Sequence, residues 1–113
     1  MSADELLHRL VGVPLHTITR GERNVILRVE SDCVIVATRR APAGEPVPVM
    51  WVQRALDKLM ADGEVRVDVP TLGHRSSFIG AVLRTLPDVE TLTCPQRVRR
   101  RAEARQAASR GGD

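Results

Sequence analysis

The fold class is decided by the stretch NVILRVESDCVIVAT, residues 24–38. Two runs rich in β-branched residues, Asn24–Glu30 and Cys33–Thr38, lie on either side of Ser31 and Asp32. β-Branched residues favour strands, and two polar residues between two such runs are typical of a tight hairpin. The stretch therefore predicts a pair of antiparallel strands.

The segments on either side of the hairpin extend this prediction. Leu15–Thr19 is a further strand candidate, which a turn at residues 20–22 joins to the hairpin as a three-stranded antiparallel meander. Nearer the N-terminus, Ser2 and Glu5 have capping-box spacing ahead of a stripe of leucines, which predicts a short helix. After the hairpin, the prolines of residues 39–48 indicate a loop or an edge segment, because proline cannot donate to a strand ladder.

A longer helix and another strand follow. Pro48 can open a helix whose apolar residues recur at helical spacing until Gly63, which can close it. Glu64–Val69 alternates valines with charged residues, as a half-exposed strand does.

A turn at residues 70–73 then leads to a second helix, which Ser76 or Ser77 can cap. Gly80 lies inside this helix, where glycine costs about 1 kcal/mol relative to alanine, so we expect a close approach by a neighbouring element such as the preceding helix. Residues 89–93 can form a last short strand. The predicted fold class is α+β: an N-terminal helix, a three-stranded meander, and an α–β–α unit that resembles a compact winged helix.

The chain has 113 residues, enough for one domain, and its charge is unevenly distributed. Residues 95–113 hold six basic and two acidic side chains, a net charge of 6 − 2 = +4, whereas residues 1–94 hold the other 11 basic and 12 acidic ones, a net charge of 11 − 12 = −1. We therefore predict a single compact domain over residues 1–94 and a basic, disordered tail over residues 95–113. Deleting such a tail is expected to leave the fold intact.

Composition excludes several classes of protein. Trp51 and Phe78 are the only aromatic residues, too few for the base-stacking surfaces of RRM or OB modules. No apolar run reaches the roughly 20 residues of a membrane span, and the charged first twelve residues are unlike a signal peptide. Two cysteines are too few for a disulfide scaffold, so we expect a reducing, cytoplasmic location and no membrane partner.

The reactive side chains do not indicate an enzyme. Lys58, the single lysine, is predicted on the exposed face of a helix and not beside the acidic cluster that metal-dependent nucleases need. His8, His16 and His74 are scattered, and the cysteines lack the spacing of a zinc site. Cys33 lies inside a β-branched run and is expected to be a small buried residue. We therefore expect no catalytic residue, no metal site and no cofactor.

Polar side chains gather at the predicted start of the second helix, namely His74, Arg75, Ser76 and Ser77. Unpaired backbone N–H groups and the helix dipole favour an anion there, and in a helix-turn-helix this turn meets DNA. An arginine can read a base edge and a serine can bond a phosphate. The alternative is a helix cap with ordinary surface residues beside it.

Two groups of arginines are further candidates for DNA contact. Turns next to the hairpin carry Arg20, Arg23, Arg39 and Arg40, which a sheet could bring to one edge. The tail carries Arg97, Arg99, Arg100 and Arg101, in a run without aromatics that would bind polyanions without sequence preference. The alternatives are a solvated loop surface for the first group and a solubilising end for the second.

Three runs in the second half of the chain resemble a known family. PVMWVQRALDKL at residues 48–59, GEV at 63–65 and TLGHRSSFIGAVL at 71–83 are similar to a small domain attached to bacterial restriction endonucleases, several of the HNH type. Residues 23–38 fit the same pattern, so the resemblance covers about residues 10–90. It implies a DNA-recognition module beside a separate nuclease domain, with recognition by residues 74–77 and by arginines of the sheet.

The expected function is therefore non-catalytic binding of duplex DNA, dependent on sequence or base modification, as the targeting module of a restriction or defence system. A nuclease domain or subunit is the candidate partner. The alternative is a protein-interaction or dimerisation module whose tail binds polyanions incidentally, which the net charge of residues 1–94 favours. A positive face joining Arg75 to Arg39 and Arg40 would favour DNA, and scattered arginines beside an apolar patch would favour a protein partner.

Overall fold

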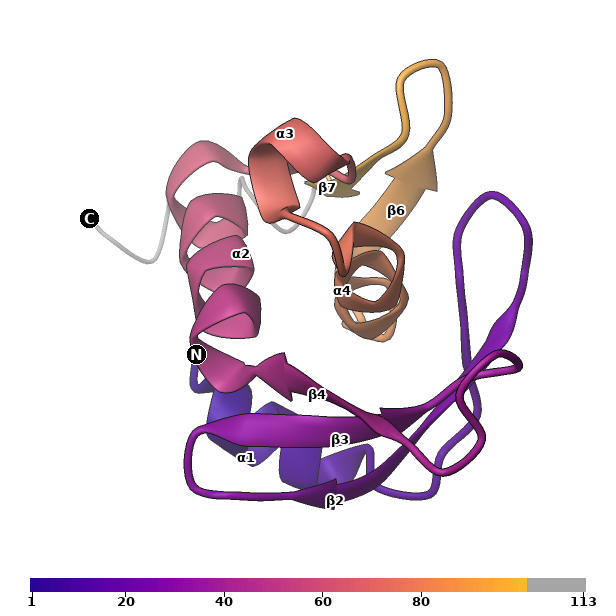
Figure 1. Cartoon of the computed structure of the whole chain (residues 1–113). Helices are drawn as coiled ribbons and strands as arrows, with labels where there is room; N and C mark the ends of the chain where they lie inside the picture. The colour runs from indigo at the N-terminus through magenta and orange to yellow at the C-terminus, as the bar shows by residue number, and fades with distance from the viewer. Residues whose placement is uncertain (102–113) are drawn as a thin grey trace.

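The computed structural model describes residues 1–101, which form a mixed α+β fold as the sequence predicts. In chain order the elements are α1 (Ala3–Arg9), β1 (Leu15–His16), β2 (Arg23–Val29), β3 (Cys33–Ala37), β4 (Glu45–Pro48), α2 (Val49–Asp62), β5 (Glu64–Arg66), α3 (Val69–Leu72), α4 (Ser76–Leu83), β6 (Val89–Leu92) and β7 (Arg97–Arg100). Strands β1-β2-β3-β4 form one antiparallel sheet, and β5-β7-β6 form a second. In Figure 1 the four-stranded sheet lies below α2 and α4.

The predicted hairpin is confirmed as β2 and β3, in which Val29 lies opposite Val34. The meander has four strands and not three, because β4 pairs with β3 at the far edge of the sheet. Pro46 and Pro48 are tolerated in β4 because an edge strand leaves one side of its backbone unpaired. The expected strand at Leu15–Thr19 is shorter than predicted, and its last three residues belong to the loop between β1 and β2.

Helices α2 and α4 of the second half start close to where the sequence predicts, whereas α3 is not predicted and the cap of α4 differs. Helix α2 follows Pro48 and ends at Gly63, whose φ of 77° is the left-handed conformation that glycine favours. Residues 69–72, predicted as the end of a strand and part of a turn at residues 70–73, form α3, because the Asp68 side chain accepts a hydrogen bond from the Thr71 N–H at 2.9 Å and caps it. Hydrogen bonds from Thr71 hold the pKa of Asp68 below its ordinary value. Neither Ser76 nor Ser77 caps α4.

The largest correction concerns residues 95–101, predicted as the start of a disordered tail. They include β7, the central strand of the three-stranded sheet, in which Val98 is fully buried between Val65 and Thr91. The domain boundary after residue 94 is therefore too early, since the ordered fold extends through β7. The rest of the predicted tail lies outside the described residues.

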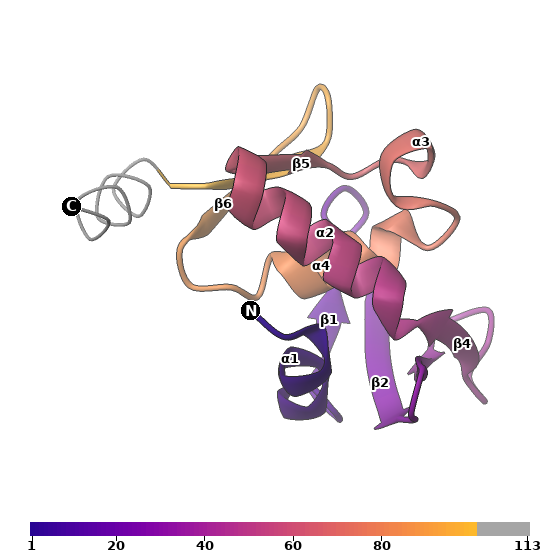
Figure 2. The same ribbon diagram turned by 90° about the vertical axis from the view of Figure 1, so that its left-hand side faces the viewer.

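Helix α4 is enclosed by the rest of the fold. The second half has the order α2, β5, α3, α4, β6, β7, which is compatible with the α+β class but does not confirm the predicted winged-helix-like α–β–α unit. However, every residue of α4 except Ser77 is buried, with α2 and β7 among its neighbours and β1 on a further side (Figure 2). A recognition helix must expose one face to a DNA groove. This helix has no such face, so any DNA contact has to come from the loops around it.

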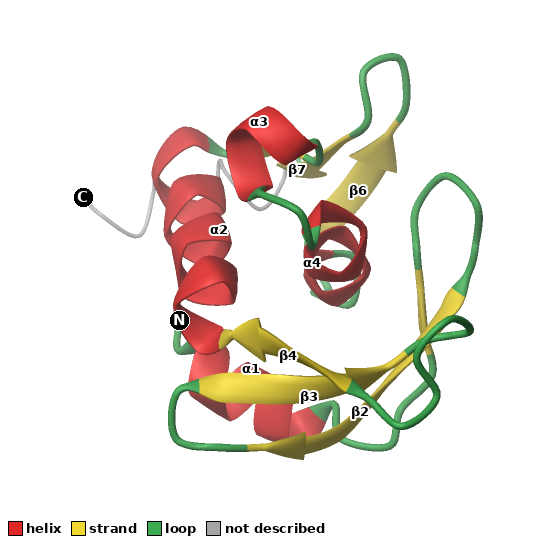
Figure 3. Ribbon diagram, viewed as in Figure 1, coloured by secondary structure: helices red, strands yellow, loops and turns green. Residues whose placement is uncertain are grey.

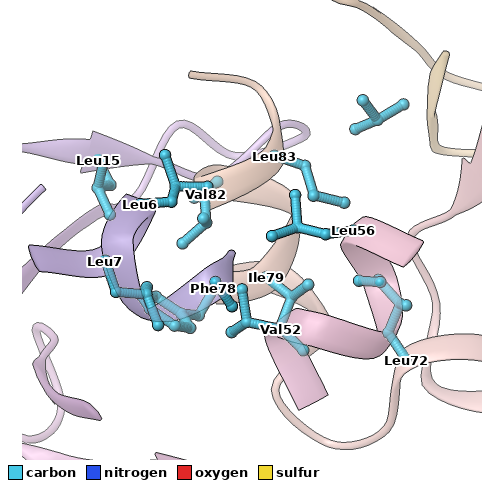
Figure 4. Close-up of a cluster of buried hydrophobic side chains, with 14 of the residues drawn as sticks. Leu6, Leu7, Leu15, Val52, Leu56, Leu72, Phe78, Ile79, Val82 and Leu83 are labelled. Carbon is cyan, nitrogen blue, oxygen red and sulfur yellow. The ribbon is translucent and has the colours of Figure 1, made fainter. Parts of the chain in front are cut away.

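One hydrophobic core connects the two halves of the chain. Figure 4 shows Ile79 and Leu83 of α4 among Leu7 of α1, Leu15 of β1 and Leu56 of α2, and all five side chains are fully or almost fully buried. Because these side chains come from both halves, residues 1–101 pack as one unit. No helix within these residues combines the length and the apolar character required to cross a bilayer.

Gly80 confirms the expected close approach, although the neighbours are not those of the preceding helix. A Cβ at this position would lie 2.7 Å from Val67 Cγ1 and 3.2 Å from Ile18 Cδ1. We expect Gly80→Ala to lower the free energy of unfolding by about 1 kcal/mol, because an overpacking cost of about 1–3 kcal/mol exceeds the gain in helix propensity. Urea denaturation measures this change, and equal or higher stability of the variant would contradict the packing argument.

Candidate functional site

Three loops that are distant in sequence enclose a polar groove of about 530 Å³, called here the arginine groove. They are the β1–β2 loop, the β3–β4 loop and the turn between α3 and α4, all drawn green in Figure 3. The lining residues are Thr17, Arg20, Glu22, Asn24, Thr38, Arg39, Arg40, His74, Arg75, Ser77 and Phe78. The groove thus unites the helix start and the hairpin arginines, which the sequence indicates as separate candidates.

Arg84, the residue that follows α4, holds the β1–β2 side of the groove in place through hydrogen bonds. Its Nη1 donates to the carbonyl oxygens of His16 and Thr17 at 3.2 and 3.3 Å. The buried Thr17 hydroxyl oxygen in turn accepts the backbone N–H of Glu22 at 2.9 Å. These bonds fix the wall of the groove that carries Arg20, so this wall is ordered before any ligand binds.

The β3–β4 loop presents the two arginines with the greatest freedom. The backbone N–H of Ala41 donates to both the hydroxyl and the carbonyl oxygen of Thr38, at 3.1 and 3.2 Å, and this closes a tight turn. Arg39 and Arg40 lie in the turn, are exposed, and have no ion pair or side-chain hydrogen bond within residues 1–101. Their guanidinium groups therefore have all their donors available for a ligand.

The turn before α4 places its polar residues unequally. Arg75 forms an ion pair with Glu45 of β4, and both side chains are about 40% exposed, at 39% and 42%. Ser76 is buried, so its side chain is not accessible to a ligand. His74 and Ser77 are exposed and line the groove. Of the four predicted residues, His74 and Ser77 thus have no side-chain partner within residues 1–101, Arg75 is paired and Ser76 is buried.

The groove carries a net positive charge. Its lining contains four arginines and one glutamate, a balance of 4 − 1 = +3, or +2 when the Glu45 partner of Arg75 is included. The Arg20–Glu22 pair is loose, with 4.0 Å between Nη1 and Oε1 and side chains that are 78% and 57% exposed, so it neutralises little. The structure therefore brings Arg75 together with Arg39 and Arg40 in one positive surface.

The remaining predicted arginines lie elsewhere. Arg23 lines an adjoining hollow of about 590 Å³ that shares Arg20 and Arg39 with the groove. Arg97 and Arg99 form ion pairs with Glu64 and Glu90 on the neighbouring strands, at 3.1 and 2.6 Å. Their charge therefore stabilises the three-stranded sheet. Arg100 and Arg101 lie at the end of that sheet and do not line the arginine groove.

Sequence reasoning missed the uncharged polar lining of the groove, namely Thr17, Asn24 and Thr38. Threonine and asparagine are ordinary residues at strand ends, so no local signal distinguishes them. Their position becomes informative only when the loops are seen to meet. They supply hydroxyl and amide groups that can bond phosphate or base edges.

Within residues 1–101 the structure indicates neither a metal site nor a reactive cysteine nucleophile. No group of three or more His, Cys, Asp or Glu residues is placed there to hold a metal ion. Cys33 is half-buried rather than buried as predicted, and its thiol donates to Glu30 Oε1 at 3.4 Å. Partial desolvation and then this hydrogen bond raise the pKa of the thiol, which disfavours a nucleophilic thiolate.

Comparison of the chain with protein-family models, with curated proteins and with solved structures finds no match. The function of the arginine groove therefore has to be inferred from its own side chains.

Proposed function

We propose that this protein is a non-catalytic module that binds duplex DNA through the arginine groove. The observation that carries the proposal is the convergence of Arg20, Arg39 and Arg40 with exposed His74 and Ser77 in one groove of net positive charge. Arginine binds phosphate in a bidentate way, and neutralised phosphates supply most of the affinity of a protein for DNA.

The mode of binding differs from that of a helix-turn-helix, because α4 has no free face. In the proposed complex, Arg20 and the hydroxyl groups of the groove contact the sugar-phosphate backbone and fix the register. Arg39 and Arg40, on their projecting turn, are the candidates for reading base edges. Dependence on sequence or modification, and a role in a restriction or defence system beside a nuclease, rest on the resemblance at residues 48–83.

A binding assay with labelled duplexes at two salt concentrations tests the proposal. If three or four phosphates are contacted, the plot of log K against log salt should have a slope of about −3, at about 0.9 per contact. Duplexes with and without modified bases, measured in parallel, show whether modification is read. Absence of binding at low salt, or binding that does not change with salt, would refute DNA binding through this groove.

Glu45 lowers the positive charge of the arginine groove through its pair with Arg75. We therefore expect Glu45→Gln to tighten DNA binding by up to about fivefold, which corresponds to about 1 kcal/mol for one surface charge next to a phosphate. Glu30→Gln is the matched control, since Glu30 also pairs with an arginine (Arg28) but lies outside the groove lining. Unchanged or weaker binding of the folded Glu45 variant would mean that Arg75 does not face the DNA.

A protein-interaction module is the alternative, and the apolar surface gives it some support. Met50 of α2 and Val69 of α3 are 58% and 51% exposed, which is high for large apolar side chains. Light scattering over a range of concentrations tests self-association. A stable dimer whose formation Met50→Ser abolishes, together with no DNA binding, would favour this function.

A further inference from the structure

A second hollow, of about 310 Å³, lies between α2 and α3 and is called here the Trp51 hollow. It is lined by Trp51, Arg54, Ala55, Lys58, Thr71, Leu72 and Gly73. Trp51, Arg54 and Lys58 are at positions i, i+3 and i+7 and therefore follow one face of α2. The indole is partly buried and packed against the core, so it forms a fixed apolar wall.

The charge of this hollow is positive without any acidic lining residue. Arg54 is exposed and has no ion pair or side-chain hydrogen bond among the described residues. Lys58 pairs with Asp62 at 3.4 Å, but both side chains are at least half exposed, so this pair is weak. An anion in the hollow would therefore meet two cations beside an aromatic ring.

The Trp51 hollow and the arginine groove lie on either side of one turn. Gly73 lines the hollow, and the next two residues, His74 and Arg75, line the groove. Gly73 has a φ of 87°, and a Cβ there would be 4.0 Å from Cζ3 of Trp51, so the turn passes directly beside the indole. A strand bound in the groove can continue over this turn into the hollow.

We propose that the Trp51 hollow binds an unpaired nucleotide of the DNA that occupies the arginine groove. The base of this nucleotide stacks on Trp51, and its phosphate lies between Arg54 and Lys58. This inference rests on the proposed function of the groove. Base–aromatic stacking requires a base that is not paired, and it tolerates any base. The volume is at the lower end for ligand sites, which suits one nucleotide and not a duplex. An acidic peptide would satisfy the charges, but it would not exploit the continuity with the arginine groove.

Tryptophan fluorescence provides a direct test, because the chain has one tryptophan and no tyrosine. The full chain is titrated with a blunt duplex and with the same duplex carrying a single-stranded extension of four deoxyadenosines, while anisotropy of labelled DNA reports affinity. We expect the extended duplex to quench Trp51 and to bind about tenfold more tightly, as one stacked base would provide. We expect the blunt duplex to bind with little quenching.

Arg54→Ala with Lys58→Ala should remove the advantage of the extension and leave the affinity for the blunt duplex unchanged. Arg9→Ala with Arg28→Ala is the matched control, since it removes the same charge outside both sites.

If neither the extended duplex nor the free single strand quenches the fluorescence of Trp51, the nucleotide site is refuted, whether or not the blunt duplex binds. Quenching by poly-glutamate but not by oligonucleotides would also overturn it, in favour of an acidic protein partner. If the single strand quenches Trp51 but the blunt duplex does not bind, the proposed duplex binding is refuted and the nucleotide site is not.

Discussion

Deleting residues 95–113 is expected to abolish the cooperative unfolding transition of this protein. The deletion removes β7, which pairs with β5 on one side and with β6 on the other. Without it both outer strands lose the one strand that they pair with within residues 1–101, and the core loses the fully buried Val98. The ion pairs from Arg97 to Glu64 and from Arg99 to Glu90 are lost as well. Thermal unfolding followed by circular dichroism measures the result.

A chain that ends at Arg101 is the matched control, because it keeps β7 and all the contacts described here. We expect it to unfold cooperatively near the melting temperature of the full chain. A milder variant, Val98→Ala, should cost about 2 kcal/mol, since each buried methylene contributes about 0.8 kcal/mol and a cavity adds to the loss. A deletion of residues 95–113 that still unfolds cooperatively would show that β7 is dispensable, as the sequence alone predicts.

The elements that the sequence predicts well are those with complete local signals. The β2–β3 hairpin has two β-branched runs and a polar turn, and α2 has an apolar stripe that ends at Gly63. Strand β7 has no such signal, because Val98 is one apolar residue among four arginines. Its position between two strands depends on β5, which comes from an earlier part of the chain, as well as on β6, which directly precedes it. A short strand of this kind is visible only in its tertiary context.

The same limit applies to the arginine groove. The sequence indicates residues 74–77 and the hairpin arginines as two candidate sites, and their union depends on the packing of three loops around α4. The burial and the partners of individual side chains also depend on residues that are distant in the sequence. Ser76 turns into the core, and Arg75 meets Glu45, a residue 30 positions away. Helix position alone does not reveal either outcome.

Reversing the charge of Arg39 and Arg40 together should cause the largest loss of DNA binding. Both arginines are exposed in a tight turn, and neither is neutralised by an acidic partner in residues 1–101. Hydrogen bonds to charged groups contribute about 1.5 kcal/mol or more each, so losing two lowers the affinity about a hundredfold. We therefore expect Arg39→Glu with Arg40→Glu to bind duplex DNA at least about a hundredfold more weakly at 0.1 M salt.

Net charge alone could produce part of this loss, so the control must change charge equally. Arg9→Glu with Arg28→Glu alters the chain by the same four units at exposed positions on α1 and β2, outside the groove lining. Long-range attraction is screened beyond about 10 Å at 0.1 M salt, so at that ionic strength the control should bind within a few fold of the unaltered chain. Equal losses in the two variants would show that DNA senses only the overall charge. A large loss confined to the Arg39–Arg40 variant, with its melting temperature unchanged, would locate the contact on the β3–β4 loop, because neither side chain contributes to the packing of the core.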